Sequence, residues 1–190
     1  MSVKIIRKRK AFKHKHWNVV TVPNVLTFAR ICVIPFLVCS FFFNECITLT
    51  IFILASVTDY MDGYIAKKFK QISRFGAFLD PIADKLLIAT TLFMIAGTKK
   101  IEGINLIPAV VVLCREFIIS GLREFLATSG NELCVISIAK YKTTLQMVSI
   151  TCLLANWFIY VRYVGVCLLW ISALLATISS VVYIKACLNK

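Results

Sequence analysis

Charge-free apolar runs follow one another along most of this chain, and they limit it to few folds. The runs cover residues 31–44, 46–58, 86–98, 103–114, 143–161 and 163–184. Crossing the hydrocarbon core of a bilayer takes about 20 helical residues, so only the last two nearly suffice alone. With 59% hydrophobic residues and a mean hydropathy of +0.84, the sequence predicts an integral membrane protein.

The four shorter runs can span a bilayer only if their helices also carry charged residues at membrane depth. Ionisable groups there are costly and face a polar interior, so they are functional candidates. Thr21 with Pro23, and Asp80 with Pro81, suit the first turns of helices. We predict one all-α integral membrane domain over residues 1–190, with six transmembrane helices near 22–43, 46–69, 76–97, 105–127, 133–158 and 162–186.

Residues 1–21 form a basic juxtamembrane segment with seven Lys or Arg and no acidic residue. An anionic lipid surface suits it better than nucleic acid, because a predicted span follows immediately. We expect a short basic interfacial helix here, with Ile5, Ile6, Phe12 and Trp17 toward the lipid.

The distribution of Lys and Arg between loops predicts the orientation. The N-terminal segment falls on the same side of a six-span topology as the basic loop at Lys67, Lys68, Lys70 and Arg74. Both termini and this loop are therefore expected to face the cytoplasm. Residues 98–100 place two lysines on the other side, in minor conflict with this assignment.

Four of the nine acidic residues lie where the second and third predicted helices meet: Asp59, Asp62, Asp80 and Asp84. Each pair shares a helical stripe with a glycine, Gly63 or Gly76, so two antiparallel neighbouring helices would bring the carboxylates together. Two like charges 4 Å apart repel by about 4 kcal/mol at an effective dielectric near 20. The cluster therefore predicts a divalent cation site for Mg²⁺, Mn²⁺ or Ca²⁺, and two such ions would clamp a diphosphate.

The aspartates also fit a solvated loop or a cation transporter. In a solvated loop they would neutralise nearby basic residues. In a transporter they would be the intramembrane carboxylates that bind the transported ion. A transporter, however, needs neither the two glycines nor a second group of buried cations.

That second group lies on the fourth and fifth predicted helices. Arg115 and Arg123 are eight residues apart, roughly on one side of a helix, and Lys140 and Lys142 open the next helix. Guanidinium groups suit a phosphate that must be held by two hydrogen bonds. The alternative is that Arg115–Glu116 and Arg123–Glu124 are local ion pairs.

The spacing Asp59-x2-Asp62-Gly63-x2-Ala66-Lys67-x8-Gly76-x3-Asp80-x3-Asp84 resembles the signature D-x2-D-G-x2-A-R-x8-G-x3-D-x3-D of the CDP-alcohol phosphatidyltransferases. The one departure is Lys67, which keeps the charge of the family arginine but loses its two-pronged geometry. The segments VPNVLTFARICVIP, RFGAFLDPIADK, REFIISGLREF and KYKTTLQM resemble the branch that uses glycerol 3-phosphate.

The resemblance implies an enzyme of the bacterial inner (cytoplasmic) membrane, multi-pass and homodimeric, with its site facing the cytoplasm. It would join CDP-diacylglycerol to sn-glycerol 3-phosphate, giving phosphatidylglycerophosphate and CMP; inositol phosphate is the alternative acceptor. By resemblance, Asp59, Asp62, Asp80 and Asp84 hold two Mg²⁺ or Mn²⁺ ions, and Asp84 is also the general base. Binding of CDP-diacylglycerol maps to Gly63, Lys67 and Gly76, and binding of the acceptor phosphate to Arg115, Arg123, Lys140 and Lys142.

Overall fold

The computed structural model describes residues 6–8, 22–69, 74–128, 131–133, 137–155, 157 and 159–188. Within these ranges, the side chains of residues 6–8, 22–23, 59–69, 74–75, 77–78, 131–133, 137–140 and 188 are not described.

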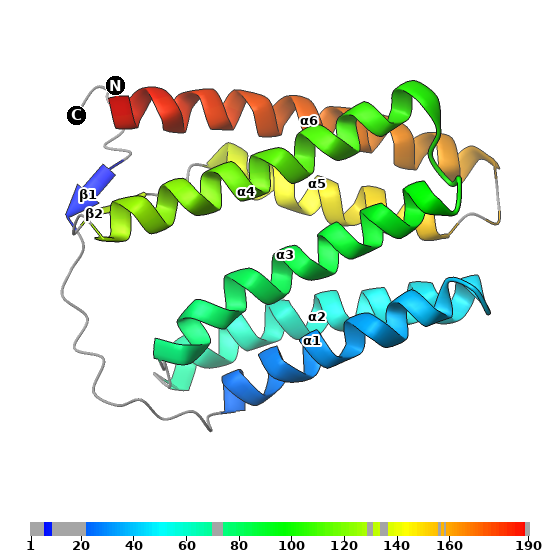
Figure 1. Cartoon of the computed structure of the whole chain (residues 1–190), viewed down its shortest axis with the longest axis horizontal. Coiled ribbons are helices and arrows are strands. Elements are labelled where there is room, and N and C mark those ends of the chain that lie inside the picture. Colours follow the sequence, from blue (N-terminus) through cyan, green and yellow to red (C-terminus); the bar gives the residue numbers. More distant parts are fainter. Residues whose placement is uncertain are drawn as a thin grey trace. The chain divides into compact units, whose positions relative to one another are not determined.

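Six α-helices make up most of the described chain, and each overlaps one predicted helix (Figure 1). Their ends differ from the predicted ends by only a few residues. The helices are α1 (Val22–Ser40), α2 (Glu45–Phe69), α3 (Arg74–Gly97), α4 (Leu106–Thr128), α5 (Ser137–Leu154) and α6 (Ile159–Leu188), with a 3-10 turn η1 (Gly103–Asn105) before α4.

A short strand replaces part of the expected N-terminal helix. β1 (Ile6–Lys8) pairs antiparallel with β2 (Asn131–Leu133), and the register sets Arg7 opposite Glu132. The helix prediction is therefore wrong for β1. On a helix Arg7 would lie beside the like-charged Lys10, three residues along, whereas the strand register sets the acidic Glu132 opposite Arg7. The rest of the predicted N-terminal helix lies outside the described residues.

The chain divides into two compact units. The α1–α3 unit contains Phe12–Ile101 and Thr151–Arg162. The α4–α6 unit contains Met1–Ala11, Glu102–Ile150 and Tyr163–Lys190. The prediction of a single domain stays a prediction.

In the α1–α3 unit, α1 packs against both other helices. Its Leu37 is buried in the unit's core, as are Phe52 of α2 and Leu87 of α3. Between membrane helices such side chains favour association through van der Waals packing, because lipid is as apolar as the core. The aspartates lie on α2 and α3, so α1 contacts both helices that carry them.

The end of this unit opposite the aspartates is fastened by polar contacts. Ser40 Oγ donates to Thr48 Oγ1 at 2.9 Å across the turn between α1 and α2. Lys100 Nζ lies 2.7 Å from Glu45 Oε1 at the start of α2. Lys100 is therefore ion-paired within this unit.

The C-terminus of α3 is closed by a Schellman motif. Lys100 N–H bonds to Ile95 O at 3.0 Å and Lys99 N–H bonds to Ala96 O at 3.1 Å. Lys99 takes the left-handed position, with φ of 56°, which is usually occupied by glycine. This turn directs Lys100 toward Glu45.

The expectation that Pro81 lies in the first turn of a helix is wrong. α3 begins at Arg74, so Pro81 lies inside it, where a proline removes one backbone hydrogen bond. The carbonyl that loses its partner is that of residue 77, whereas Lys85 Nζ donates to the Pro81 carbonyl, at 2.8 Å. A proline inside a membrane helix is tolerated where other groups satisfy the freed backbone atoms, so its position does not mark the helix start.

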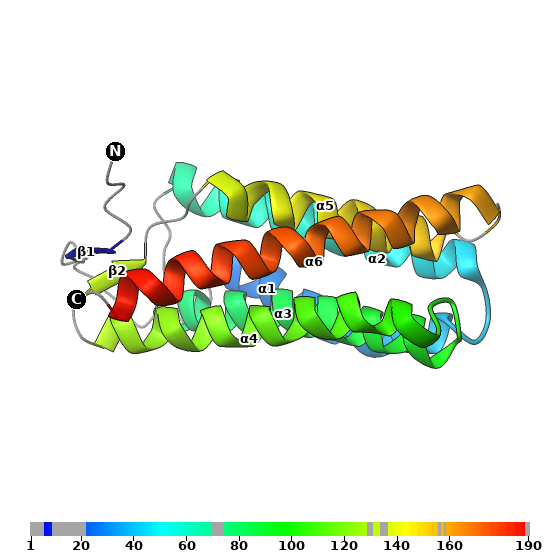
Figure 2. The same ribbon diagram turned by 90° about the horizontal axis from the view of Figure 1, so that it is seen from above.

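In the α4–α6 unit, α6 runs between α4 and α5 in the view of Figure 2, and it contacts both helices. Ile119 and Leu126 of α4 pack with Tyr183 of α6 in a buried cluster. Ser149 Oγ of α5 donates to Gly165 O of α6 at 2.7 Å. These contacts place the polar residues of α4 and α5 beside α6.

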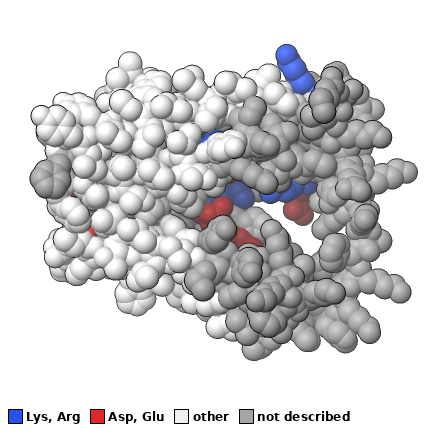
Figure 3. Space-filling view, turned by 180° about the vertical axis from the view of Figure 1, so that it is seen from behind, with Lys and Arg blue, Asp and Glu red and all other residues white. Residues whose placement is uncertain are grey.

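The surface of the described chain is strongly apolar. Phe36, Phe93, Phe125 and Tyr160 are all exposed, and few Lys, Arg, Asp or Glu atoms are visible among the described side chains in Figure 3. By length and composition, Gly103–Thr128 and Ile159–Cys187 are able to cross a membrane, and Asn24–Ser40 and Glu45–Thr58 are shorter apolar segments. Such a surface fits lipid contact. Six transmembrane spans stay a prediction.

Candidate active site

Asp80, one of the predicted metal ligands, is held from α1. Thr27 Oγ1 donates a hydrogen bond to Asp80 Oδ1 at 2.7 Å. Arg30 Nη1 lies 3.9 Å from the same oxygen. The Arg30 side chain is 1% exposed and that of Asp80 is 45% exposed, and Thr27 is also buried. One oxygen of an accessible carboxylate therefore accepts a hydrogen bond from Thr27 and lies within ion-pair distance of Arg30.

The other members of the predicted metal site are described to different extents. Asp84 follows Asp80 by one turn on α3 and is half-buried, as is Gly76. Asp59 and Asp62 lie on α2, as do Gly63 and Lys67, but these four side chains are outside the described ones. Among the side chains that are described, no three acidic, His or Cys residues gather as a metal site would require. The four-carboxylate cluster stays a prediction.

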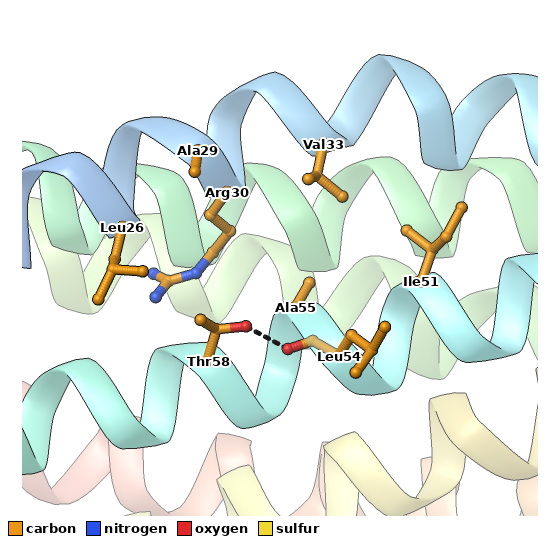
Figure 4. A pocket seen from close by; sticks show the side chains of 8 residues that line it. All are labelled: Leu26, Ala29, Arg30, Val33, Ile51, Leu54, Ala55 and Thr58. Carbon is orange, nitrogen blue, oxygen red and sulfur yellow. Dashed lines mark hydrogen bonds between the residues drawn. The ribbon is translucent and has the colours of Figure 1, made fainter.

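A pocket of about 210 Å³ opens between α1 and α2 beside Arg30. Figure 4 shows the Arg30 guanidinium extending from α1 toward α2, near Thr58, whose hydroxyl donates to Leu54 O. Apolar walls with one cation fit a ligand that is part hydrocarbon and part anion. The lining residues are Leu26, Ala29, Arg30, Val33, Ile51, Leu54, Ala55 and Thr58.

In the α4–α6 unit, Glu116 joins two of the predicted phosphate-binding residues. Its Oε1 accepts a hydrogen bond from Lys142 Nζ and lies 3.4 Å from Arg115 Nη1. The Lys142 side chain is 0% exposed and that of Arg115 is 9% exposed. Buried charges are tolerated only when paired, so one carboxylate compensates two buried cations on neighbouring helices.

Side chains of α5 and α6 complete the surroundings of this triad. Arg115 Nη2 donates to Ser179 Oγ at 3.2 Å, and Ser172 Oγ donates to the Lys142 carbonyl at 3.4 Å. Gln146, one turn beyond Lys142, is fully buried, and neither of its amide atoms has a hydrogen-bond partner among the described residues.

The structure separates the four predicted phosphate-binding residues. Arg115 and Lys142 meet through Glu116, whereas Arg123 is exposed. Eight residues place two side chains about 80° apart around a helix of 3.6 residues per turn, so their surroundings differ. Lys140 lies in α5, but its side chain is outside the described ones.

Thr27, Arg30 and Glu116 were not among the predicted site residues. Thr27 bonds to Asp80 with Arg30 nearby, and Glu116 pairs with Lys142 as well as with its neighbour Arg115. Glu116 had a signal in the sequence, because an acid inside an apolar helix needs a cationic partner. Thr27 had none, because a threonine in a helix usually bonds to its own backbone.

Comparison with known proteins identifies the family. Residues 20–178 match the family model described as CDP-alcohol phosphatidyltransferase. The chain belongs to this family. The CDP-alcohol phosphatidyltransferase match includes the complete stretch from Asp59 to Asp84, along with Thr27, Arg30 and Glu116.

Individual CDP-alcohol phosphatidyltransferases are similar over most of their length. The CDP-diacylglycerol–glycerol-3-phosphate 3-phosphatidyltransferase of Rickettsia felis is 42% identical over 174 residues, which cover 87% of this chain and 94% of the relative. The protein of the same name from Haemophilus influenzae is 40% identical over 170 residues, covering 86% of this chain and 91% of the relative. CDP-diacylglycerol–glycerol-3-phosphate 3-phosphatidyltransferase 2 of Arabidopsis thaliana is 39% identical over 187 residues, which cover 88% of this chain and 80% of the relative.

Proposed function

We propose that this protein transfers the phosphatidyl group of CDP-diacylglycerol to sn-glycerol 3-phosphate, producing phosphatidylglycerophosphate and CMP. The observation that carries the proposal is the similarity at about 40% identity, over most of both chains, to enzymes named for this reaction. It favours glycerol 3-phosphate over inositol phosphate as acceptor, and family membership argues against a cation transporter.

The family depends on divalent metal ions, and the described donors fit such an ion. Asp80 is accessible, and both described contacts from α1 go to its Oδ1, so Oδ2 is suited to a hard cation. Asp59, Asp62, Asp80 and Asp84 would hold Mg²⁺ or Mn²⁺, in a site of two ions. Bound there, the ions would neutralise the diphosphate and stabilise the departing CMP.

In this mechanism Asp84 is the general base. Its carboxylate takes the proton of the acceptor's 1-hydroxyl as that oxygen attacks the phosphorus carrying diacylglycerol. The bond between this phosphorus and the CMP oxygen breaks, so one phosphoester replaces one phosphoanhydride. Gly63, Lys67 and Gly76 border the nucleotide.

The acceptor phosphate is assigned to the basic residues Arg115, Arg123, Lys140 and Lys142. The accessible guanidinium of Arg123 suits direct contact with a phosphate from solution. Arg115 and Lys142 add a positive potential, which Glu116 partly offsets. Head-group chemistry at a membrane surface lets the acyl chains stay in lipid, and this agrees with the apolar surface of the described helices.

The direct test is CMP release by purified protein supplied with CDP-diacylglycerol and glycerol 3-phosphate. We expect release with Mg²⁺ or Mn²⁺, loss with a chelator and recovery when the metal is restored. Separating the lipid products after incubation with glycerol 3-phosphate or inositol phosphate identifies the acceptor. Protein that releases no CMP with either acceptor and either metal would contradict the proposal.

A further inference from the structure

Two contacts from α1 to Asp80 converge on the same oxygen. Thr27 Oγ1 donates to Oδ1 at 2.7 Å, and Arg30 Nη1 lies 3.9 Å from Oδ1. Both α1 side chains are buried, whereas the carboxylate is 45% exposed. The fixed oxygen therefore faces the protein, and the second oxygen is the one available to a ligand.

Thr27 uses its hydroxyl differently from Thr50, Thr91 and Thr177. Each of those three donates to a carbonyl of its own helix, at 2.7–2.8 Å. Thr27 reaches across to a side chain 53 residues away. A helical threonine is limited to two main χ1 rotamers, and the one present here directs the hydroxyl at Asp80.

A carboxylate bound by such a donor loses rotational freedom. The terminal torsion of aspartate is broad, so an unsupported Asp80 would sample many orientations of Oδ2. Groups that bond to a metal-binding side chain commonly fix its orientation, and their removal costs about 10- to 100-fold in metal affinity or activity. The sequence of α1 contains no acidic or histidine residue, so it supplies no carboxylate or imidazole to a cation.

We propose that Thr27 is a positioning residue for the divalent cation site, holding Asp80 Oδ1 beside Arg30 so that Oδ2 is directed at the cation. This inference rests on the proposed function, because it takes Asp80 as a metal ligand. Through Thr27, α1 contributes to cation binding without contacting the ion.

The test measures Mn²⁺ binding directly, by electron paramagnetic resonance of free Mn²⁺ with detergent-purified protein and no substrate. Thr27→Val removes the hydroxyl and keeps the shape, and we expect apparent Mn²⁺ affinity about 10- to 100-fold weaker. Thr27→Ser keeps the donor and is expected to restore binding.

Thr91→Val is the matched control. Thr91 is as buried as Thr27, but its hydroxyl donates to Leu87 O within α3, at 2.7 Å. Its replacement tests the general cost of removing a buried hydroxyl, and it should leave Mn²⁺ affinity unchanged. If Thr27→Val does not fold, as judged by its thermal transition, Thr27→Ala tests the same loss with less volume.

Enzyme kinetics supply a second readout. For Thr27→Val, the Mg²⁺ concentration giving half-maximal rate should rise by about the same factor as the Mn²⁺ dissociation constant, whereas Thr91→Val should leave that concentration unchanged. A purely structural role would not shift metal dependence selectively.

The outcomes separate this inference from the proposed function. Equal Mn²⁺ affinity in Thr27→Val and wild type, or an equal loss in Thr91→Val, overturns the positioning role and leaves the phosphatidyl transfer standing. Wild-type binding in Asp80→Asn instead removes Asp80 from the metal site, and with it both the ligand assignment and this inference.

Discussion

At the scale of single residues, Glu116 is one acidic side chain serving two buried cations. Arg115 lies on its own helix and Lys142 on α5, and both reach the same Oε1. The local pair expected from sequence is therefore part of an interhelical triad. Removing the shared carboxylate would leave two buried charges uncompensated, which costs far more than losing an exposed pair.

Glu116→Gln should lower the stability of the detergent-purified protein by roughly 3 kcal/mol. The amide keeps the shape of the side chain but cannot balance Arg115 and Lys142. The thermal unfolding transition measures the loss. Glu124→Gln, at an exposed position of the same helix, should stay within about 0.5 kcal/mol of wild type; an equal loss at both positions would refute the triad's importance.

Arg123→Ala should act on binding rather than on stability, because Arg123 is exposed. We expect the KM for glycerol 3-phosphate to rise about 10- to 100-fold, the scale of a charged hydrogen bond, with little change in thermal stability. Lys185→Ala, at an exposed basic position of α6, is the control. An unchanged KM in Arg123→Ala would assign the phosphate to other residues.

Asp84→Asn should reduce turnover by more than about a hundredfold, because an amide cannot take the acceptor's proton. Rates of CMP release at saturating substrates and metal measure this loss. Glu102→Gln, an exposed acidic position before η1, should retain wild-type turnover. Near-normal turnover of Asp84→Asn would exclude this carboxylate as the base.

At the scale of elements, α1 links the helices that carry the aspartates. It packs against both α2 and α3, and its first turns supply Thr27 and Arg30 to Asp80. At the other end of the same unit, Lys100 forms an ion pair with Glu45. The turn before Lys100 contains Lys99, which has a positive φ.

Lys99→Gly should stabilise the protein by about 0.5–1 kcal/mol. Glycine has no Cβ, so it removes the strain of the left-handed conformation at this position. The figure is net of the greater backbone entropy that glycine loses on folding. Lys99→Ala keeps the Cβ and separates this effect from loss of the charge. The thermal unfolding transitions of the two variants measure the change in stability. A stabilisation by alanine equal to that by glycine would refute the backbone explanation.

At the scale of the whole molecule, the charge distribution predicts that both termini face the cytoplasm. A fluorescent protein that folds only in the cytoplasm, fused after Lys190, should fluoresce, and an alkaline phosphatase that folds only outside it should be inactive at the same position. The same two fusions after Lys99 should give the reverse result. The opposite pattern at both positions would invert the predicted topology.

The sequence by itself determined the six helices and the spacing of the aspartates. Both follow from local patterns, because charge-free runs limit where helices lie and residues three or four apart share a helical face. Its local patterns failed at Pro81, which is tolerated inside α3, and at Ile6–Lys8, where pairing with a distant strand replaced a helix.

Only the tertiary structure decided which side chains meet. Thr27 reaches Asp80 across 53 positions of the chain, Glu116 reaches Lys142 across 26, and Arg115 reaches Ser179 across 64. No local periodicity encodes such contacts, since they depend on how the helices pack and turn toward one another. The folding of the chain thus turned Arg115 and Lys142 into partners of Glu116, and left Arg123 exposed.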